Sequence, residues 1–584
     1  MKRLWPFFQR FLRHRRQLVA GFACLPLAQL GDIVVTVIIG NALTALQKMK
    51  PGSDVSFLSG IFAIVLGLAA FRGVLRYLQR WWIVVVSRWV ENELKQELFD
   101  KLVALPFSFH TKSRSGDVVS RVTSDVENIR MFLGPGVMYT AGAVVMVPVA
   151  MALLFSLNAT LTATMILPLL LMGVGMKIST PKLHRWSEAV QESIADIGHR
   201  AQESFSGIRI VKGYGREAQQ IARFDAASKR NMENQIQLGH SRGLTNATTH
   251  AANDFTFAVV LALGGLAMLD RNLPVGDLFK FIDLTFKVFW PIIAVGWIFG
   301  MYPRALASAK RIDELLSTAS DILEPARPVA LPSVQGALSL SHVSFTYEGA
   351  EKPAIADLSV DVPAGSVLGV VGPTGSGKTT LLYLLGRLFD AQGEIRLDGV
   401  PIRDLSLATL RGAIGYVPQD SFLFSQTYRE NVAFGADGEL TDSRIRDLID
   451  AACMTEEVAA FPNGLDQLIG ERGVTLSGGQ RQRTCIARAL ARDPRILVLD
   501  DALSAVDSET EMRLLEHLRR AGTGRTVVIA AHRLSSVVRA DRIVVLDREG
   551  RVEATGRHAD LLAREGWYRK TWQRQQAQEE LSVL

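Results

Sequence analysis

Six long apolar stretches constrain this chain more than any other feature. They cover residues 17–46, 55–86, 131–158, 159–178, 243–269 and 275–302. A helix needs about 20 mainly apolar residues to cross the hydrocarbon core of a bilayer, and every stretch reaches that length. The sequence therefore predicts six membrane-spanning helices, which form an all-α membrane domain in the first half of the chain.

Basic residues predict the orientation of these helices. The segment MKRLWPFFQRFLRHRRQ precedes the first span and carries Lys2, Arg3, Arg10, Arg13, Arg15 and Arg16. Such clusters stay on the cytoplasmic side, and their mixture with aromatic residues favours an amphipathic elbow helix on the membrane surface. The long charged links near 87–130 and 179–242 then also lie in the cytoplasm, where we expect the helices to continue.

The chain changes character after Leu316. Residues 317–336 carry three prolines and few apolar residues, which is typical of a linker. Beyond it, apolar runs such as SVLGVVG, RILVLD and TVVIAAH alternate with helical segments, the pattern of a parallel sheet covered by helices. We therefore expect a membrane domain at 1–316, a linker at 317–336 and a soluble α/β domain at 337–584.

The stretch VVGPTGSGKTT, which begins at Val370, fits the phosphate-loop pattern G-x-x-x-x-G-K-[ST]. A predicted strand precedes it and a predicted helix follows it, which is the setting that phosphate binding requires. Asp500 ends the apolar strand RILVLD, where a buried carboxylate is costly without a cation or a hydrogen-bond donor. Asp500 and the Thr379 hydroxyl are therefore predicted to hold Mg²⁺ beside the phosphates.

A second glycine-containing segment, LSGGQRQR (476–483), precedes the predicted helix TCIARALA. Small residues at a helix N-terminus favour anion binding. Because the phosphate loop already accounts for one nucleotide, this segment is predicted to serve the nucleotide of another subunit.

With these motifs in this order, the chain resembles a half-transporter of the ATP-binding cassette exporter family, with six spans fused to one nucleotide-binding domain. The resemblance implies an ATPase that uses ATP and Mg²⁺ and exports or flips a hydrophobic or amphipathic drug, lipid or peptide by alternating access. It also implies a second half-transporter chain as partner, contact with membrane lipids, and a place in the cell (inner) membrane with the ATPase domain in the cytoplasm. The net charge of +7 follows from the basic residues beside the spans, so nucleic acid is not expected as a partner.

The resemblance also implies roles for single residues. Tyr347 stacks on adenine, Asp507 crosses between cassettes, and Glu471 is the acidic residue before the signature segment. The phosphates are surrounded by Gly372, Gly375, Gly377, Lys378, Thr379 and Thr380, and by Ser477, Gly478, Gly479 and Gln480 of the opposite cassette; Mg²⁺ is held by Thr379, Gln419 and Asp500; catalysis uses Asp501, His532 and Gln419. Residues 109–125 and 213–224 resemble the coupling helices.

One position departs from the family pattern. The residue after the Mg²⁺ aspartate is usually glutamate, which orients the attacking water, whereas this chain has Asp501. Its carboxylate is one methylene shorter, about 1.5 Å further back, and misplacement on that scale costs on the order of 10²-fold in rate. Either a small backbone shift compensates, or the chain is one half of a heterodimer in which its own site is slow and the partner carries glutamate.

Charged residues inside the spans offer the only indication of substrate. Asp283 and Lys287 are four residues apart and can pair along one helix face, either lining a cavity or bonding neighbouring helices. Asp32 and Asp254 are further cavity candidates. Arg72, Arg76 and Arg80 share a face of the second span, where extension of the side chains to lipid headgroups is the favoured explanation.

Two other functions share this architecture. A nucleotide-gated channel or regulator would need a long regulatory insertion, and an uptake system would need extra spans or a substrate-processing domain. The sequence shows none of these features, which favours an exporter.

Overall fold

The computed structural model describes residues 2–50, 56–269, 273–470, 473, 475–520 and 524–583. The chain divides into two compact units. The first consists of Met1–Val103 and Gly116–Ser317, and the second of Ala104–Ser115 together with Thr318–Leu584. Each unit has its own secondary-structure class, helical in the first and mixed α/β in the second.

The first unit contains the six predicted spans. Within the described residues, six helical stretches are long and apolar enough to cross a membrane, which confirms the predicted number. They are α2 (Arg15–Lys48), α3 (Phe57–Ala104), the run Ser115–Leu157, α8 (Ala159–Ser206), α10 (Glu217–Leu269) and α11 (Val275–Ser317). The third run is made of α5 (Ser115–Ser120), η2 (Arg121–Asp125), α6 (Val126–Met131), η3 (Phe132–Gly136) and α7 (Val137–Leu157).

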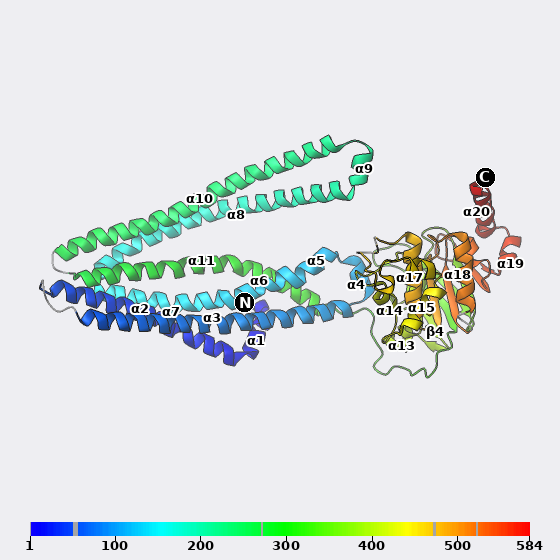
Figure 1. Ribbon diagram of the computed structural model, residues 1–584, viewed down its shortest axis with the longest axis horizontal. Helices are drawn as coiled ribbons and strands as arrows, with labels where there is room; N and C mark the ends of the chain where they lie inside the picture. Colours follow the sequence, from blue (N-terminus) through cyan, green and yellow to red (C-terminus); the bar gives the residue numbers. More distant parts are fainter. Residues whose placement is uncertain are drawn as a thin grey trace. The chain divides into compact units, whose positions relative to one another are not determined.

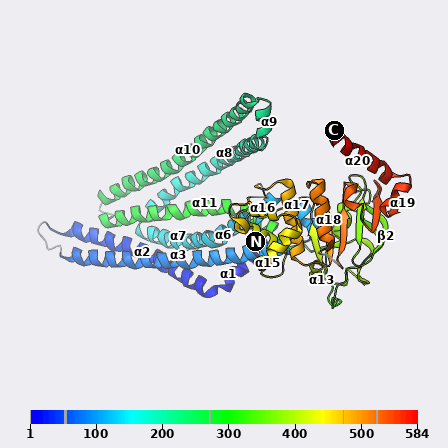
Figure 2. The same cartoon turned by 45° about the vertical axis from the view of Figure 1, so that its right-hand side comes forward.

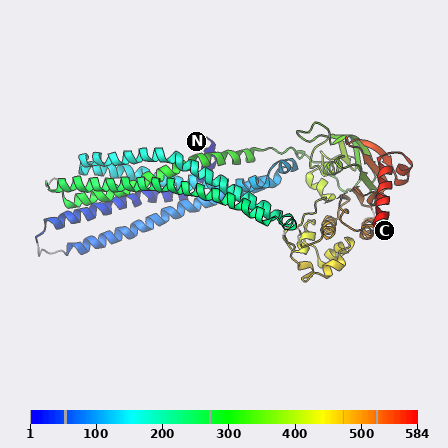
Figure 3. The same ribbon diagram turned by 90° about the horizontal axis from the view of Figure 1, so that it is seen from above.

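These helices pack in two groups. Helices α8 and α10 run side by side and are joined by the short α9 (Ile208–Gly213), and the pair stays together in all three views (Figures 1, 2 and 3). Helices α2, α7 and α11 pack together around buried residues such as Ile33, Met146 and Phe281. Large apolar side chains such as Phe62 and Phe71 of α3 face outward, as expected of surfaces that contact lipid.

The N-terminal segment forms the predicted amphipathic helix. After the short η1 (Lys2–Leu4), α1 (Trp5–Arg13) buries Phe7 and Phe11 while Trp5 and Leu12 stay exposed. The first turn of α1 contains a proline. The N–H groups of a first turn have no partner within the helix, so the missing N–H of proline costs nothing there.

The second unit contains two sheets. The larger has the strand order β10-β9-β3-β8-β7-β6, parallel except for β10, and the smaller is antiparallel with the order β2-β1-β4-β5. The large sheet uses β3 (Val367–Val371), β6 (Ile414–Val417), β7 (Ile496–Asp500), β8 (Thr526–Ala530), β9 (Arg542–Leu546) and β10 (Val552–Gly556); the small one uses β1 (Leu338–Phe345), β2 (Ile355–Val362), β4 (Gln392–Leu397) and β5 (Val400–Pro401). The inner strands β7 and β8 are buried along their whole length, as a sheet covered by helices on both faces requires.

Helices of the second unit cover the sheets and connect their strands. They are α4 (Phe107–Lys112), α12 (Lys378–Leu385), α13 (Leu407–Gly412), α14 (Tyr428–Ala433), α15 (Asp442–Ala451), α16 (Thr455–Ala459), η4 (Gly464–Asp466), α17 (Gly478–Ala491), α18 (Ser508–Arg520), η6 (Leu534–Val537), α19 (His558–Ala563) and α20 (Trp567–Val583). Six helical spans followed by this α/β domain confirm the predicted fold class.

Candidate functional site

The phosphate loop joins β3 to α12 at the carboxyl end of the central sheet. Gly377 is the residue before α12 and has a φ of +89°, a left-handed conformation that favours glycine. A Cβ at this position would lie 2.1 Å from the carbonyl oxygen of Ala354, so a larger residue cannot replace it without moving backbone. The loop therefore presents the backbone N–H groups at the start of α12, where an anion binds favourably.

Two side chains of the loop fit a phosphate ligand. Ser376 is 1% exposed, and its buried hydroxyl has no hydrogen-bond partner in the described part of the chain. Among the described residues, the Lys378 ammonium donates only to loop carbonyls, at 2.9 Å to Gly372 and 3.1 Å to Pro373. Burial lowers the pKa of Lys378, and the carboxylates of Asp501 and Asp500 oppose that shift. Both groups are placed to donate to an anionic ligand.

The predicted Mg²⁺ ligands Thr379 and Asp500 are in contact. The Thr379 hydroxyl donates to Asp500 Oδ1 at 2.9 Å, and the Tyr416 hydroxyl donates to Asp500 Oδ2 at 3.2 Å. Burial raises the pKa of Asp500, and these two hydrogen bonds act against the increase. One carboxylate and one hydroxyl supply the oxygen ligands that Mg²⁺ prefers, and the ion takes its remaining ligands from water and substrate phosphates. The residues present therefore fit Mg²⁺.

Asp501 and His532 meet at the ends of two neighbouring parallel strands. Asp501 follows β7 with a φ of +47°, and its N–H donates to Ala530 at the end of β8 at 2.8 Å. The backbone N–H of His532 donates to Asp501 Oδ1 at 3.2 Å. The Asp501 carboxylate is thus bonded to the backbone of the loop that carries His532.

The signature segment and Asp507 also lie close together. Ser477 begins α17 with a capping box, in which its hydroxyl accepts from the Gln480 N–H at 3.2 Å and its own N–H donates to Gln480 Oε1 at 2.9 Å. A Cβ on Gly479 would lie 2.9 Å from the carbonyl oxygen of Ala505. The N–H of Thr510 lowers the pKa of Asp507, which caps the turn before α18.

The remaining predicted residues occupy the rim of this site. The Tyr347 hydroxyl lies 3.0 Å from the Thr380 hydroxyl, so the ring is held beside α12 with 37% of the residue exposed. Gly375, with a φ of +82°, lies within the loop. Gln419 is exposed immediately after β6, and Gly478 begins α17. Glu471 lies outside the described residues.

Aromatic rings connect α4, part of the first predicted coupling segment, to the nucleotide site. Phe107 lies 5.3 Å from Tyr383 and 5.8 Å from Phe389, measured between ring centroids. Tyr383 lies 6.3 Å from Tyr416, whose hydroxyl bonds Asp500, and Phe389 lies 5.5 Å from Tyr347. α4 therefore contacts a packed cluster that continues to the predicted adenine and Mg²⁺ residues.

Sequence reasoning missed two residues of this region. Tyr416 lies in β6, which pairs with β7 in the parallel sheet. Parallel neighbours end at the same edge of a sheet, so the position of Tyr416 near the end of β6 could have indicated its contact with Asp500 at the end of β7. Gln575 of α20 donates to the carbonyl oxygen of His532 and accepts from the N–H of Leu534, both at 2.9 Å. No sequence pattern indicates that contact, because 43 residues separate Gln575 from His532.

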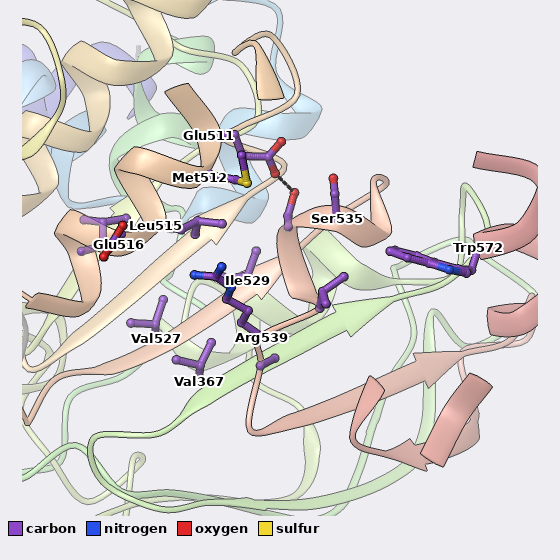
Figure 4. A pocket seen from close by; sticks show the side chains of 14 residues that line it. Val367, Glu511, Met512, Leu515, Glu516, Val527, Ile529, Ser535, Arg539 and Trp572 are labelled. Atoms are coloured by element: carbon purple, nitrogen blue, oxygen red, sulfur yellow. Dashed lines mark hydrogen bonds between the residues drawn. The ribbon is translucent and has the colours of Figure 1, made fainter. Parts of the chain in front are cut away.

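A cavity of about 380 Å³ lies beside this contact, between α18, η6 and α20 (Figure 4). Strand residues including Val527 and Ile529 line one side, and Trp572 of α20 lies at the other end. The buried Glu511 of α18 accepts a hydrogen bond from Ser536 of η6. Polar contacts from both α18 and α20 therefore hold the segment that follows His532.

The predicted membrane charges fall into two sets. Asp32 of α2 accepts from both Arg72 and Arg76 of α3, so these arginines pair with a carboxylate instead of extending to lipid headgroups. Lys287 donates to Asp283 Oδ2 at 2.6 Å and to the carbonyl oxygen of Asp32 at 3.0 Å, which joins α11 to α2. Asp32 and Lys287 line a cavity of about 430 Å³, whereas Asp254 lies on an exposed face of α10.

Comparisons with known proteins agree with this geometry. The family model described as "ABC transporter transmembrane region" matches residues 18–292, and the one described as "ABC transporter" matches residues 355–504. The chain is 33% identical over 545 residues to the probable multidrug resistance ABC transporter ATP-binding/permease protein YheI of Bacillus subtilis, with 92% of each chain covered. It is 35% identical over 523 residues to the ATP-dependent lipid A-core flippase of Thiobacillus denitrificans, covering 88% of this chain and 89% of that protein.

A solved structure of a bacterial Atm1-family ABC exporter with ATP bound is similar over nearly the whole chain. It aligns with a TM-score of 0.78 at 28% identity and covers 96% of this chain and 98% of that one. These similarities extend across both the helical unit and the α/β unit. The chain therefore belongs to the ABC transporter family, as an integral membrane protein whose cytoplasmic domain is an ATPase that uses ATP and Mg²⁺ and is coupled to translocation.

Proposed function

We propose that the chain exports or flips a hydrophobic or amphipathic substrate across the cell (inner) membrane, as one half of a heterodimer with one slow ATP site. Relatives named as a probable multidrug resistance transporter and a lipid A-core flippase support this substrate class. We assign the membrane domain to 1–316, the linker to 317–336 and the nucleotide-binding domain to 337–584.

The observation that carries the transport proposal is the aromatic contact of α4. Phe107 packs against Tyr383, and Tyr383 packs against Tyr416, which bonds Asp500. In our proposal Lys378 and Ser376 bind the phosphates, Thr379, Asp500 and Gln419 hold Mg²⁺, and His532 contacts the terminal phosphate. Movement of these groups on nucleotide binding then reaches α4 through packed rings, and from there the spans.

Asp501 carries the heterodimer proposal. Its short side chain accepts a hydrogen bond from the backbone N–H of His532, which engages one of the two carboxylate oxygens. The partner would carry glutamate at this position and would use the signature segment of this chain, Ser477–Gln480, to complete its own fast site.

Two matched substitutions test the slow site in the complex that co-purifies with this chain. Asp501→Asn should change total ATP hydrolysis little, whereas Asp501→Glu should increase it because the longer side chain restores the reach to water. Glutamate to glutamine in the partner should nearly abolish hydrolysis. A stable assembly of this chain alone, with vigorous hydrolysis that is lost on Asp501→Asn, would show that the heterodimer proposal is wrong.

Direction of transport is tested separately. Inside-out vesicles that contain the complex should accumulate amphipathic drugs, lipids or peptides only when ATP is supplied. Accumulation in right-side-out vesicles instead would favour uptake, and ATP-gated flux down a gradient would favour a channel.

A further inference from the structure

None of the residues assigned above to ATP or Mg²⁺ lines the cavity between α18, η6 and α20, which has a volume of about 380 Å³ (Figure 4). Glu511, Leu515 and Leu518 share the face of α18 that borders it, because residues three and four positions apart lie on one side of a helix. Val527 and Ile529 are alternate residues of β8 and so point to the same face of the sheet. Secondary structure therefore places two walls of this cavity, one on α18 and one on the sheet.

Most of the cavity lining is apolar. Val367 of β3, Met512 of α18 and Ala540 add to the apolar walls, and the indole of Trp572 lies at one end (Figure 4). Apolar walls offer water few hydrogen bonds, and cavities of this kind can stay dry or take up apolar molecules. The lining is therefore better suited to a ligand with apolar surface than to water.

The charged side chains of the lining are Glu511, Glu516 and Arg539. Each of them has an interaction partner within this chain, and Glu511 accepts a hydrogen bond from Ser536. A charged ligand would lose its hydration without meeting an unpaired counter-charge, which is unfavourable in a largely apolar site. The lining therefore favours a neutral ligand, and this conclusion does not depend on a second chain.

The volume and the indole narrow the ligand further. An apolar cavity of about 150 Å³ holds one benzene molecule. This cavity is more than twice as large, and its volume lies in the range of about 300–1,000 Å³ that is typical of small-molecule sites. Aromatic rings attract one another in offset-stacked or edge-to-face arrangements, so the indole of Trp572 favours a flat aromatic ligand. A molecule of two or three fused rings satisfies both conditions.

The cavity adjoins the segment that follows His532. Ser535 and Ser536 of η6 line it, and η6 begins two residues after His532. Trp572 lies about one turn before Gln575 of α20, whose side chain donates to the His532 carbonyl oxygen. A ligand in the cavity would therefore contact both elements that adjoin the backbone of His532.

We propose that this cavity is a regulatory site for a neutral molecule of two or three fused aromatic rings, whose binding lowers ATP hydrolysis. A ligand shifts a conformational equilibrium towards the state that it binds better. A molecule that fits between α18, η6 and α20 as they lie here opposes any movement of His532 that hydrolysis requires. The proposal goes beyond the export function, because ATP hydrolysis alone reports it.

Binding of 1-aminoanthracene tests the proposal on the full chain in phosphatidylcholine nanodiscs, with the partner chain where one co-purifies. This probe has three fused rings, is neutral at neutral pH and fluoresces more strongly in apolar surroundings. Anthracene-2-sulfonate carries the same rings with a negative charge, and empty nanodiscs correct for partition into lipid. The neutral probe should bind saturably and about tenfold or more tightly than the sulfonate. ATP hydrolysis, measured in parallel, should fall as the site fills.

Leu515→Trp is the informative variant, because it places an indole in the cavity from a partly buried position of α18. It should weaken binding of the neutral probe by about tenfold and make hydrolysis resistant to it. Arg513→Trp is the matched control, since it adds the same ring at an exposed position of the same helix that does not line the cavity. Trp572→Ala removes the aromatic wall without filling the cavity, and it should also weaken binding.

Each outcome bears on the proposal. Saturable binding that Leu515→Trp and Trp572→Ala weaken and Arg513→Trp keeps, together with a fall in hydrolysis, would support it. Binding no greater than to empty nanodiscs, or binding unchanged in both cavity variants, would overturn the site. Equal binding of the sulfonate would overturn the neutral class. Saturable binding that leaves hydrolysis unchanged, or raises it, would overturn the regulatory role.

Discussion

Both units of this protein bury charged groups, but they assemble them in different ways. In the ATPase unit, Lys378 and Thr379 are adjacent in the chain, and Asp500 ends strand β7 at the same carboxyl end of the large sheet. In the membrane unit, Asp32 meets its partners only across helices, at Arg72 and Arg76 of α3 and at Lys287 of α11. The first arrangement depends on two sequence motifs that the parallel sheet brings together, and the second on helix packing, so the two should respond differently to loss of a single charge.

The largest expected effect is on the stability of the membrane unit. Asp32→Ala leaves Arg72 and Arg76 without their carboxylate in a site where the Asp32 side chain is only 8% exposed. Removing one partner of a fully buried ion pair costs about 3–5 kcal/mol, and the cost here should be smaller because the side chain of Arg72 is 25% and that of Arg76 54% exposed. We expect a marked loss of monodisperse protein on heating in nanodiscs, as measured by size-exclusion chromatography.

Restoring charge balance is the control for Asp32→Ala. Adding Arg72→Gln to Asp32→Ala removes one of the two unpaired cations, and the double variant should recover part of the lost stability. If Asp32→Ala is as heat-resistant as the unmodified chain, the arginines have other partners and packing does not depend on this carboxylate.

The next effect concerns Lys378, whose loss should affect chemistry and spare the fold. Lys378→Ala removes the cation that faces the phosphates, so ATP binding at this chain's own site should weaken, whereas total hydrolysis should fall less because the proposed fast site belongs to the partner. Photo-crosslinking of ATP to this chain should weaken, while thermal stability stays near that of the exposed-site control Lys352→Ala. Unchanged crosslinking would mean that the phosphate loop has been misplaced.

These two sites show what the sequence could and could not predict. Six spans and the loop from Gly372 to Thr379 follow from length, apolar character and fixed spacing, all of which are local. The sequence favoured a position at the lipid headgroups for Arg72 and Arg76, whereas the structure pairs both with a carboxylate. The helix face that these arginines share gives no information about a carboxylate on another helix. Tyr416 and Gln575 were missed for the same reason, since their partners are set by sheet order and by the packing of α20.

A smaller effect is expected at Tyr416, and it should depend on pH. Burial raises the pKa of Asp500, and the Tyr416 hydroxyl bond opposes that increase. Tyr416→Phe removes the bond, so the pKa of Asp500 rises further and its carboxylate is protonated at a higher pH. Hydrolysis at this chain's own ATP site should fall more at acid pH than at neutral pH, and the acid side of its pH profile should move upward.

The Tyr383→Phe variant is the matched control for this measurement. The Tyr383 ring packs 6.3 Å from that of Tyr416, and the two hydroxyls are hydrogen-bonded. Tyr383 does not itself bond Asp500 in the described structure, so its phenylalanine variant keeps the ring and the direct bond from Tyr416 to Asp500. Its acid limb should shift less than that of Tyr416→Phe. An equal shift in both variants would show that the effect does not depend on the direct bond from Tyr416 to Asp500.

The smallest expected effect tests whether helix packing also positions a residue in the ATPase unit. Gln575 holds the backbone on both sides of Arg533, through the His532 carbonyl oxygen and the Leu534 N–H. Leu534 and Val537 are fully buried and anchor this segment in the core, so Gln575→Ala should leave the fold intact. Loss of two hydrogen bonds between neutral groups, partly replaced by water, should lower kcat by roughly two- to tenfold with little change in KM.

The Gln575→Glu variant separates the two contacts of this side chain. Glutamate can still accept from the Leu534 N–H, but it cannot donate to the His532 carbonyl oxygen and places a negative charge beside it. If orientation of His532 is what matters, Gln575→Glu should lower kcat at least as much as Gln575→Ala. Recovery of full activity with glutamate would instead show that the Leu534 contact suffices. In that case α20 supports η6, and the position of His532 depends on Asp501 and on the strand ends. The ATPase site would then depend less on helix packing than the membrane site does.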